Sequence, residues 1–213
     1  MTRKFTFLLM ALLALAGLKS WGQMDVVIGT GTSTTSYYPF NGLYNYSYSE
    51  MLYGADEIGV AGSINSISFN SSSATSKAID FDLDIYMKNV NRTTHSSNSD
   101  WETVSESDKV CHATLSGYTT GWITFTLDEP FEYDGTSTLM IAFDHNTGDY
   151  SSKSFYSHTS ENHKSLCKYL DGSNIDPSDP AATVGASTNF SGTLHHGSQT
   201  LRAPLLSECY HHK

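Results

Sequence analysis

The sequence predicts an all-β protein, an antiparallel β-sandwich of the jelly-roll-like or immunoglobulin-like kind. After residue 22 the chain is rich in Ser, Thr, Tyr, Asn and Gly. Tyr and Thr favour strands, whereas Asn and Gly favour turns. Short stretches of alternating apolar and polar residues recur, and clusters of turn-forming residues separate them. This spacing is typical of sandwiches and barrels.

The first 22 residues have the pattern of a secretory signal. Arg3 and Lys4 precede an apolar run over 5–18, and the small residues Ser20 and Gly22 follow it. A membrane span needs about 20 apolar residues, so this run is too short. We expect cleavage after Gly22 and a protein that is secreted or at the cell surface, with no membrane insertion after signal removal. The alternative is an uncleaved N-terminal anchor.

The clearest strand runs from residue 79 to residue 88. Its odd-numbered residues are apolar, and its even-numbered residues include Asp80, Asp82 and Asp84. Because successive side chains of a strand point to opposite faces, the apolar set is expected in the core and the acids in solvent. The apolar run 139–143 suits a strand buried on both faces. Further strands are expected over 24–28, 64–69, 110–115, 122–127, 154–158 and 165–170, and at most one helical turn over 105–108.

The domain prediction is one β-sandwich over 23–193, followed by an irregular tail over 194–213. A chain of this length suits a single domain, which we expect to be a monomer. From residue 194 onward the alternation disappears, and two His-His pairs stand without a pattern around them. Cys111, Cys167 and Cys209 allow one disulfide in an oxidising compartment, and the sequence leaves the pairing open.

The charge balance excludes some classes of partner. The whole chain has 12 Lys and Arg against 22 Asp and Glu. Loss of the signal leaves 9 basic against 22 acidic side chains, a net charge of −13. Like charges repel, so nucleic acid and anionic membranes are not expected as partners. Extracellular glycans, proteins and cations stay compatible with this surface.

An aromatic segment over 37–53 is the main candidate for ligand binding. Tyr44, Tyr46 and Tyr48 would share one face if they lie on a strand, and Tyr38 lies just before them. A row of Tyr rings would stack on sugar rings. The alternative is ordinary packing, because Tyr also fits a half-buried strand face.

A turn after the apolar run 139–143 is the candidate metal site. Asp144, Asn146 and Asp149 would supply oxygen ligands to a calcium ion, although the spacing is not that of an EF-hand. The alternative is that these side chains cap the turn. No other cofactor is expected.

The sequence does not indicate an enzyme. It has no HExxH, no GxSxG and no phosphate-binding loop. His112 follows Cys111 directly, but neighbouring strand residues point to opposite faces and cannot form a catalytic pair. Two carboxylates that converge only in the fold remain open as a hydrolase site.

Several motifs together resemble a known β-sandwich module. They are YYPFNGLYNYSYSEMLY over 37–53, preceded by GTGT, then SDW over 99–101, GW at 121–122 and PFEYDG over 130–135. The module occurs in secreted surface proteins of Gram-negative gut and oral bacteria, among them adhesins, fibronectin-type-III-containing proteins and extracellular proteases. The resemblance covers roughly residues 26–169. It implies an accessory, non-catalytic role.

The leading hypothesis is therefore a secreted, non-catalytic module for extracellular binding or adhesion, with a glycan or a protein as its ligand. One alternative is a secreted hydrolase, or an accessory domain detached from an extracellular protease. The other is a structural spacer without its neighbours. A deep pocket with convergent carboxylates would favour a hydrolase, and a shallow surface lined by Tyr would favour binding.

Overall fold

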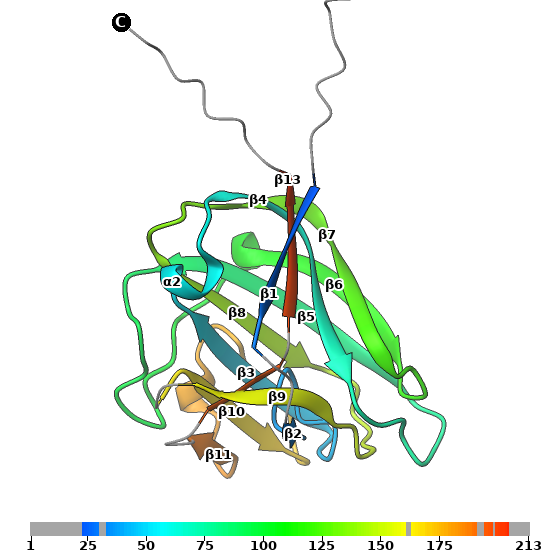
Figure 1. The fold of residues 1–213 in the computed structure, drawn as a ribbon. Helices are drawn as coiled ribbons and strands as arrows, with labels where there is room; N and C mark the ends of the chain where they lie inside the picture. The colour runs from blue at the N-terminus through cyan, green and yellow to red at the C-terminus, as the bar shows by residue number, and fades with distance from the viewer. Residues whose placement is uncertain (1–22, 30–32, 161–162, 191–193, 198, 205–213) are drawn as a thin grey trace, which may run out of the picture.

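The computed structural model describes residues 23–29, 33–160, 163–190, 194–197 and 199–204. These residues form an antiparallel β-sandwich of two sheets, which confirms the predicted fold class (Figure 1). The expected signal over 1–22 and the end of the expected tail lie outside the described residues. Among the described residues, the structure has no helix long and apolar enough to span a bilayer.

Sheet A has seven strands. Its path runs β1-β13-β4-β9-β12, with β2 paired to β9 and β7 paired to β4. The strands are β1 (Gln23–Ile28), β2 (Ser33–Thr35), β4 (Gly62–Ser71), β7 (Gly121–Tyr133), β9 (Phe155–Ser160), β12 (Leu194–Gly197) and β13 (Gln199–Pro204).

Sheet B has six strands in the order β11-β10-β3-β8-β5-β6. They are β3 (Tyr46–Tyr53), β5 (Asp80–Val90), β6 (Lys109–Ser116), β8 (Thr138–His145), β10 (Ser165–Leu170) and β11 (Ser187–Phe190). The short helix α2 (Ala55–Ile58) follows β3, and 3-10 turns occupy Glu106–Asp108 and Pro180–Ala182. The turn expected over 105–108 is confirmed.

The main core lies between the two sheets and follows the predicted alternation. In β5 the odd-numbered apolar residues from Phe81 to Met87 are all buried. In β7 Ile123, Phe125 and Leu127 are buried, whereas the residues between them face solvent. Every residue of β8 is buried, which confirms the expectation of a strand covered on both faces.

An irregularity in β4 keeps its apolar residues on the core face. Ile64 and Ile67 are three positions apart, so a regular strand would point them to opposite faces. The pairing of β4 with β7 shifts register between Ile64 and Ser66. Because a bulge of this kind adds one residue to the strand, both isoleucines pack in the core.

A second apolar cluster covers the outer face of sheet B. Two segments lie over this face, the loop over 91–108 and the loop over 171–186, and they contribute Val104 and Ile175 to the cluster. Tyr86 lies on the same face of β5 as Asp82 and Asp84, and it is 2% exposed because the cluster covers it. The cluster comprises Tyr48, Leu52, Tyr86, Val90, Val104, Met140, Ala142 and Ile175, with Trp101 partly buried against it.

The irregular tail expected from residue 194 onward is wrong for two segments. Residues 194–197 form β12, and residues 199–204 form β13. The backbone of β13 lies between β1 and β4, with Leu201 opposite Val26 on one side and Ile67 on the other. The sandwich therefore continues past residue 193, because the backbones of neighbouring strands recruit a segment that lacks clear alternation.

Candidate binding surface at the loop end of the sandwich

Five loops meet at one end of the sandwich. The strand registers place them there: β3 begins opposite the end of β10, β5 begins opposite the end of β6, and β7 begins opposite the end of β4. Backbone hydrogen bonds join the loops, such as Thr75 N–H to Gly117 O at 3.0 Å and Ser151 N–H to Gly42 O at 2.7 Å. We call this surface the loop end. It comprises loops 36–45, 72–79, 117–120, 146–154 and 171–186, with the adjoining strand residues Tyr46, Trp122 and Tyr169.

Exposed apolar side chains concentrate at the loop end. Eight large hydrophobic residues are exposed in the described part of the chain, and six belong to the loop end. The other two are Val27 on β1 and Tyr156 on β9. Loops at the end of a sandwich are a common place for binding residues, because a rigid framework holds them. The six are Tyr37 (37% exposed), Leu43 (44%), Tyr118 (56%), Trp122 (49%), Tyr150 (54%) and Val184 (87%).

Three tyrosine rings form a group within the loop end. Tyr169 lies in the middle, with its ring centroid 5.9 Å from that of Tyr37 and 4.4 Å from that of Tyr44. Tyr169 also packs against the main core, so the group has a fixed base. Tyr37 is exposed, whereas Tyr44 and Tyr169 are half-buried. The group is called the tyrosine platform below.

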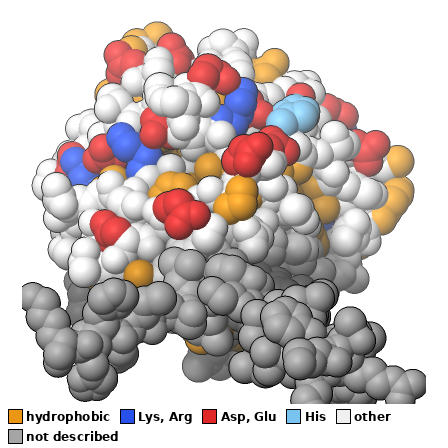
Figure 2. Space-filling model, turned by 90° about the horizontal axis from the view of Figure 1, so that it is seen from above, with side chains coloured by type: hydrophobic (Ala, Val, Ile, Leu, Met, Phe, Trp, Pro, Cys, Tyr) orange, Lys and Arg blue, Asp and Glu red, His pale blue; other side chains and the backbone are white. Residues whose placement is uncertain are grey.

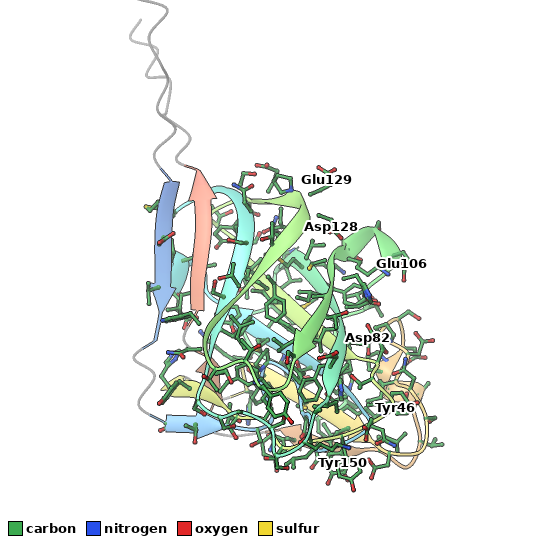
Figure 3. All side chains as sticks on the ribbon, turned by 90° about the vertical axis from the view of Figure 1, so that its right-hand side faces the viewer. Tyr46, Asp82, Glu106, Asp128, Glu129 and Tyr150 are labelled. Atoms are coloured by element: carbon green, nitrogen blue, oxygen red, sulfur yellow. The ribbon has the colours of Figure 1, made fainter. Side chains whose placement is uncertain are left out.

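Tyr150 marks a second part of the loop end. Lys77 Nζ lies 4.9 Å from the centroid of its ring and 2.7 Å from Asp149 Oδ1. Figure 3 shows Tyr150 and Tyr46 toward one end of the molecule, and Asp128 and Glu129 at the other. Gly148, with φ +67°, turns the loop beside Tyr46: a Cβ at this position would lie 3.2 Å from the Tyr46 hydroxyl.

A buried lysine ties three of these loops together. Lys153 is fully buried, and its Nζ donates to the carbonyls of Ser73, Gly117 and Thr119 at 3.3, 3.2 and 2.7 Å. Its ammonium has three N–H groups, so each carbonyl has a donor. Burial lowers the pKa of Lys153 to about 8. Lys153 thus fixes the loops that carry Lys77 and Tyr118.

The four tyrosines predicted as ligand contacts separate into two pairs. Tyr44 and Tyr46 lie at the loop end and are half-buried. Tyr48 and Tyr38 are 0% and 1% exposed, so they cannot contact a ligand at the surface, and this part of the prediction is wrong. Tyr44 also precedes β3 rather than standing on it. The physical reason is that loops cover the outer face of sheet B over Tyr48, while Tyr38 packs between the sheets.

The three residues predicted to bind calcium have different partners in the structure. Asp144 is 3% exposed on the outer face of β8, and its Oδ2 accepts from Asn146 Nδ2 at 3.2 Å. Asp149 pairs instead with Lys77. No group of three or more His, Cys, Asp or Glu that would hold a metal ion is found within the described segments. Burial, with a contribution from Asp84, raises the pKa of Asp144 to about 7, although the Asn146 bond opposes this shift.

A carboxylate–imidazole pair lies on the outer face of sheet B, next to Asp144. Asp84 stands directly opposite Asp144 on β8 and opposite His112 on β6. His112 Nδ1 is 2.8 Å from Asp84 Oδ1, and this bond raises the pKa of His112. Cys111 is buried on the opposite face, as the alternation predicted, so it does not complete a nucleophile–base set with His112.

Two of the three cysteines cannot form a disulfide with each other. Cys111 and Cys167 are free and buried, on β6 and β10. Three strands separate β6 from β10 in sheet B. At about 4.8 Å per strand, the two residues are roughly 19 Å apart, far beyond the Cα separation of a disulfide. Cys209 lies outside the described residues.

The opposite end of the molecule is acidic, and a buried polar contact lies beside it, under the loop over 91–108. Glu50 on β3 is fully buried, and both its carboxylate oxygens accept the N–H of Glu102, at 3.1 and 3.0 Å. His95 Nδ1 lies 3.9 Å from Glu50 Oε2 and donates to Asp100 O at 2.9 Å. Figure 2 shows many acidic side chains on this end. Its acidic residues are Asp56, Glu57, Asp100, Glu102, Glu106, Asp108, Asp128, Glu129, Glu132 and Asp134.

Several residues of the loop end were missed as binding candidates, among them Tyr118, Trp122 and Tyr150. A signal for two of them is present: Tyr118 and Tyr150 stand in the polar turn segments SGYTTG and TGDYSS. An aromatic residue flanked by turn formers has no neighbouring strand positions with which to share a buried face.

Comparisons of the chain with protein-family models, with curated proteins and with solved structures found no match.

Proposed function

We propose that this protein is a secreted, non-catalytic β-sandwich module that binds an extracellular ligand through its loop end. One observation supports this above all: six of the eight exposed large hydrophobic side chains of the described residues lie at that end. Scattered single apolar residues are normal on a surface, whereas a concentration on neighbouring loops is typical of an interaction site. Tyr and Trp suit such a site because they combine a large apolar ring with a polar group.

The rigidity of the loop end also supports binding. Lys153 holds three of the loops, and Tyr169 anchors the tyrosine platform on the core. A surface that is already ordered loses little conformational freedom when a ligand binds, so more of the contact energy appears as affinity. The net charge of −13 on the secreted chain keeps the protein soluble and restricts its partners to those that tolerate negative charge.

Binding arrays test the proposal. The secreted full chain is applied to one array of glycans and one of extracellular matrix proteins, and each ligand found is measured again with Tyr118→Ala and Tyr150→Ala. We expect each substitution to weaken binding several-fold without changing the melting temperature. Tyr156→Ala is the matched control, because Tyr156 is 38% exposed on β9, outside the loop end.

Two results would contradict the proposal. One is a chain that binds nothing on either array. The other is a ligand whose affinity is the same for the wild type and for every loop-end variant.

A further inference from the structure

We infer that the ligand of the loop end is a neutral glycan, with the tyrosine platform as its primary contact. This inference rests on the proposed function and adds the chemistry of the ligand. Three features support it: the arrangement of the rings, the polar groups beside them, and the distribution of charge over the loop end.

The rings of the platform touch one another but are tilted, so they do not form one flat apolar patch. Tyr37 and Tyr44 flank Tyr169, and their planes are tilted by 43° and 40° to its plane. The centres of protein–protein interfaces are instead contiguous, apolar and depleted in charged groups. A short row of tilted Tyr rings, each with a hydroxyl at its edge, suits a sugar ring, which has an apolar face and a polar rim.

Hydrogen-bonding groups with fixed positions stand next to the platform. Asn45 follows Tyr44, and its N–H and Nδ2 donate to Asp171 Oδ1 and Asp171 O at 3.1 and 3.0 Å. Nearby, Asn174 Nδ2 donates to Asn146 Oδ1 at 2.6 Å. Asn45, Asp171 and Asn174 are not buried. An ionised carboxylate only accepts hydrogen bonds, so the oxygens of Asp171 suit a ligand rich in hydroxyl donors.

The charges of the loop end exclude anionic glycans. Its exposed acidic residues are Asp149, Asp171, Asp176 and Asp179, and Asp80 lies beside them at the start of β5. Lys77 is its exposed basic residue among those described, and Asp149 already pairs with it. Lys153 and the neighbouring Lys168 are buried, with their ammonium groups on backbone carbonyls. A sulfate or carboxylate group on a sugar would therefore meet negative charge without a free cationic partner.

The test compares neutral and anionic glycans on the secreted full chain. The neutral probes are oligosaccharides of hexose and N-acetylhexosamine, and the anionic probes are polygalacturonate and heparin. We expect neutral probes to bind equally at low salt (~20 mM) and high salt (~500 mM). Anionic probes should fail to bind at low salt, and any weak binding should grow as salt screens the repulsion.

Variants of the platform locate the contact. Tyr44→Ala and Tyr169→Ala should each weaken binding of the neutral probe by roughly 10-fold, which corresponds to about 1.4 kcal/mol, near the upper end of the range for an aromatic contact. Tyr44→Phe keeps the ring and should stay within about 3-fold, a range that separates stacking from a hydroxyl contact. Tyr156→Ala should change nothing.

The outcomes separate this inference from the proposed function. Binding of a matrix protein that depends on Tyr118 or Tyr150, with no neutral glycan bound, would overturn the inference and leave the proposed function standing. Tight binding of heparin or polygalacturonate at low salt would do the same. If no loop-end substitution changed the affinity for any ligand, both the inference and the proposed function would be wrong.

Discussion

The side-chain carboxyl group of Glu50 on β3 accepts the backbone N–H of Glu102, which lies 3.1 and 3.0 Å from its two oxygens. This contact joins the middle of sheet B to the long loop over 91–108, which covers the second apolar cluster. Arg92 closes the same loop, because its guanidinium donates to Asp100 O and Asp100 Oδ1 at 2.7 and 2.9 Å. The loop that shields Tyr48 from solvent is therefore held by buried polar contacts as well as by apolar packing.

Glu50 makes the stability of the protein depend on pH. Burial raises its pKa from 4.5 to about 8. Between these values the unfolded chain loses this proton while the folded chain keeps it, so stability falls as pH rises from about 4.5 to 8. The whole effect is at most roughly 5 kcal/mol.

The substitution Glu50→Gln tests this dependence. The amide keeps an acceptor for the Glu102 N–H but does not titrate, so we expect a smaller loss of stability between pH 5 and pH 8 than in the wild type. Urea unfolding at the two pH values measures it. Glu106→Gln is the control, because its side chain is 80% exposed. Equal pH dependence in wild type and Glu50→Gln would show that Glu50 is ionised in the fold.

His145 acts in the opposite direction, at acidic pH. It is fully buried, and its ring packs 5.5 Å from Phe40 and 5.3 Å from Phe81, between ring centroids. Burial lowers its pKa from 6.5 to about 4. As pH falls through this range the unfolded chain binds a proton that the folded chain rejects, so stability is lost, by up to roughly 3 kcal/mol.

We expect His145→Phe to be more stable than the wild type at pH 4.5, with a smaller difference at pH 7.5. The variant keeps a ring of similar size and removes two buried nitrogens that have no hydrogen-bond partner. Chemical denaturation at both pH values checks this. His112→Phe provides the contrast: the bond to Asp84 raises the pKa of His112, so its loss should destabilise the protein more at pH 4.5 than at pH 7.5. A gain of the same size at both pH values would rule out protonation as the cause.

The buried tyrosine Tyr48 should stabilise the fold more than the half-buried Tyr44 does. Tyr48 is fully buried, so Tyr48→Ala should lower the free energy of unfolding by about 3–5 kcal/mol, the range for large aromatic truncations in cores. Tyr44 is half-buried at the loop end, so Tyr44→Ala should cost less than about 1 kcal/mol. Urea midpoints of the two variants measure the contrast. Equal costs would mean that Tyr44 also belongs to the core.

Lys153 should limit the flexibility of the loops to which it donates hydrogen bonds. In Lys153→Met the carbonyls of Ser73, Gly117 and Thr119 lose their buried donor, at a cost of about 1–3 kcal/mol. Hydrogen exchange should then rise in loops 72–79 and 117–120 and stay unchanged in the loop over 91–108. Lys77→Met is the control, because its exposed ion pair contributes only about 0–1 kcal/mol. Unchanged exchange in both loops would show that Lys153 does not hold them.

The strands with strong alternation could be predicted from the sequence. β5, β7 and β8 were found because apolar residues at every second position, or in a short continuous run, have few ways to be buried. β2, β11, β12 and β13 were not found. The segment of β13, for example, becomes a strand through hydrogen bonds to β1 and β4, and such pairing leaves no periodic pattern in the segment itself.

The candidate site was predicted only in part. Of the tyrosines that the sequence predicts as ligand contacts, Tyr44 and Tyr46 lie at the loop end and are half-buried. Tyr48 is also a tyrosine and stands two positions after Tyr46. It is nevertheless covered by a loop that lies more than 40 residues away in the sequence. Conversely, Tyr169 joins the platform from a distant strand. Which rings meet, and which are shielded, depends on contacts between segments far apart in the chain.

By itself the sequence determined the period of burial, and with it the all-β class, because period-two alternation is a local property that any pairing of strands must respect. The tertiary structure alone decided which loops share an end, which tyrosines remain at the surface, and that Cys111 and Cys167 lie too far apart to pair. These outcomes depend on strand order and on the packing of loops against sheet B. Both are set by the free energy of the whole fold rather than by any one segment.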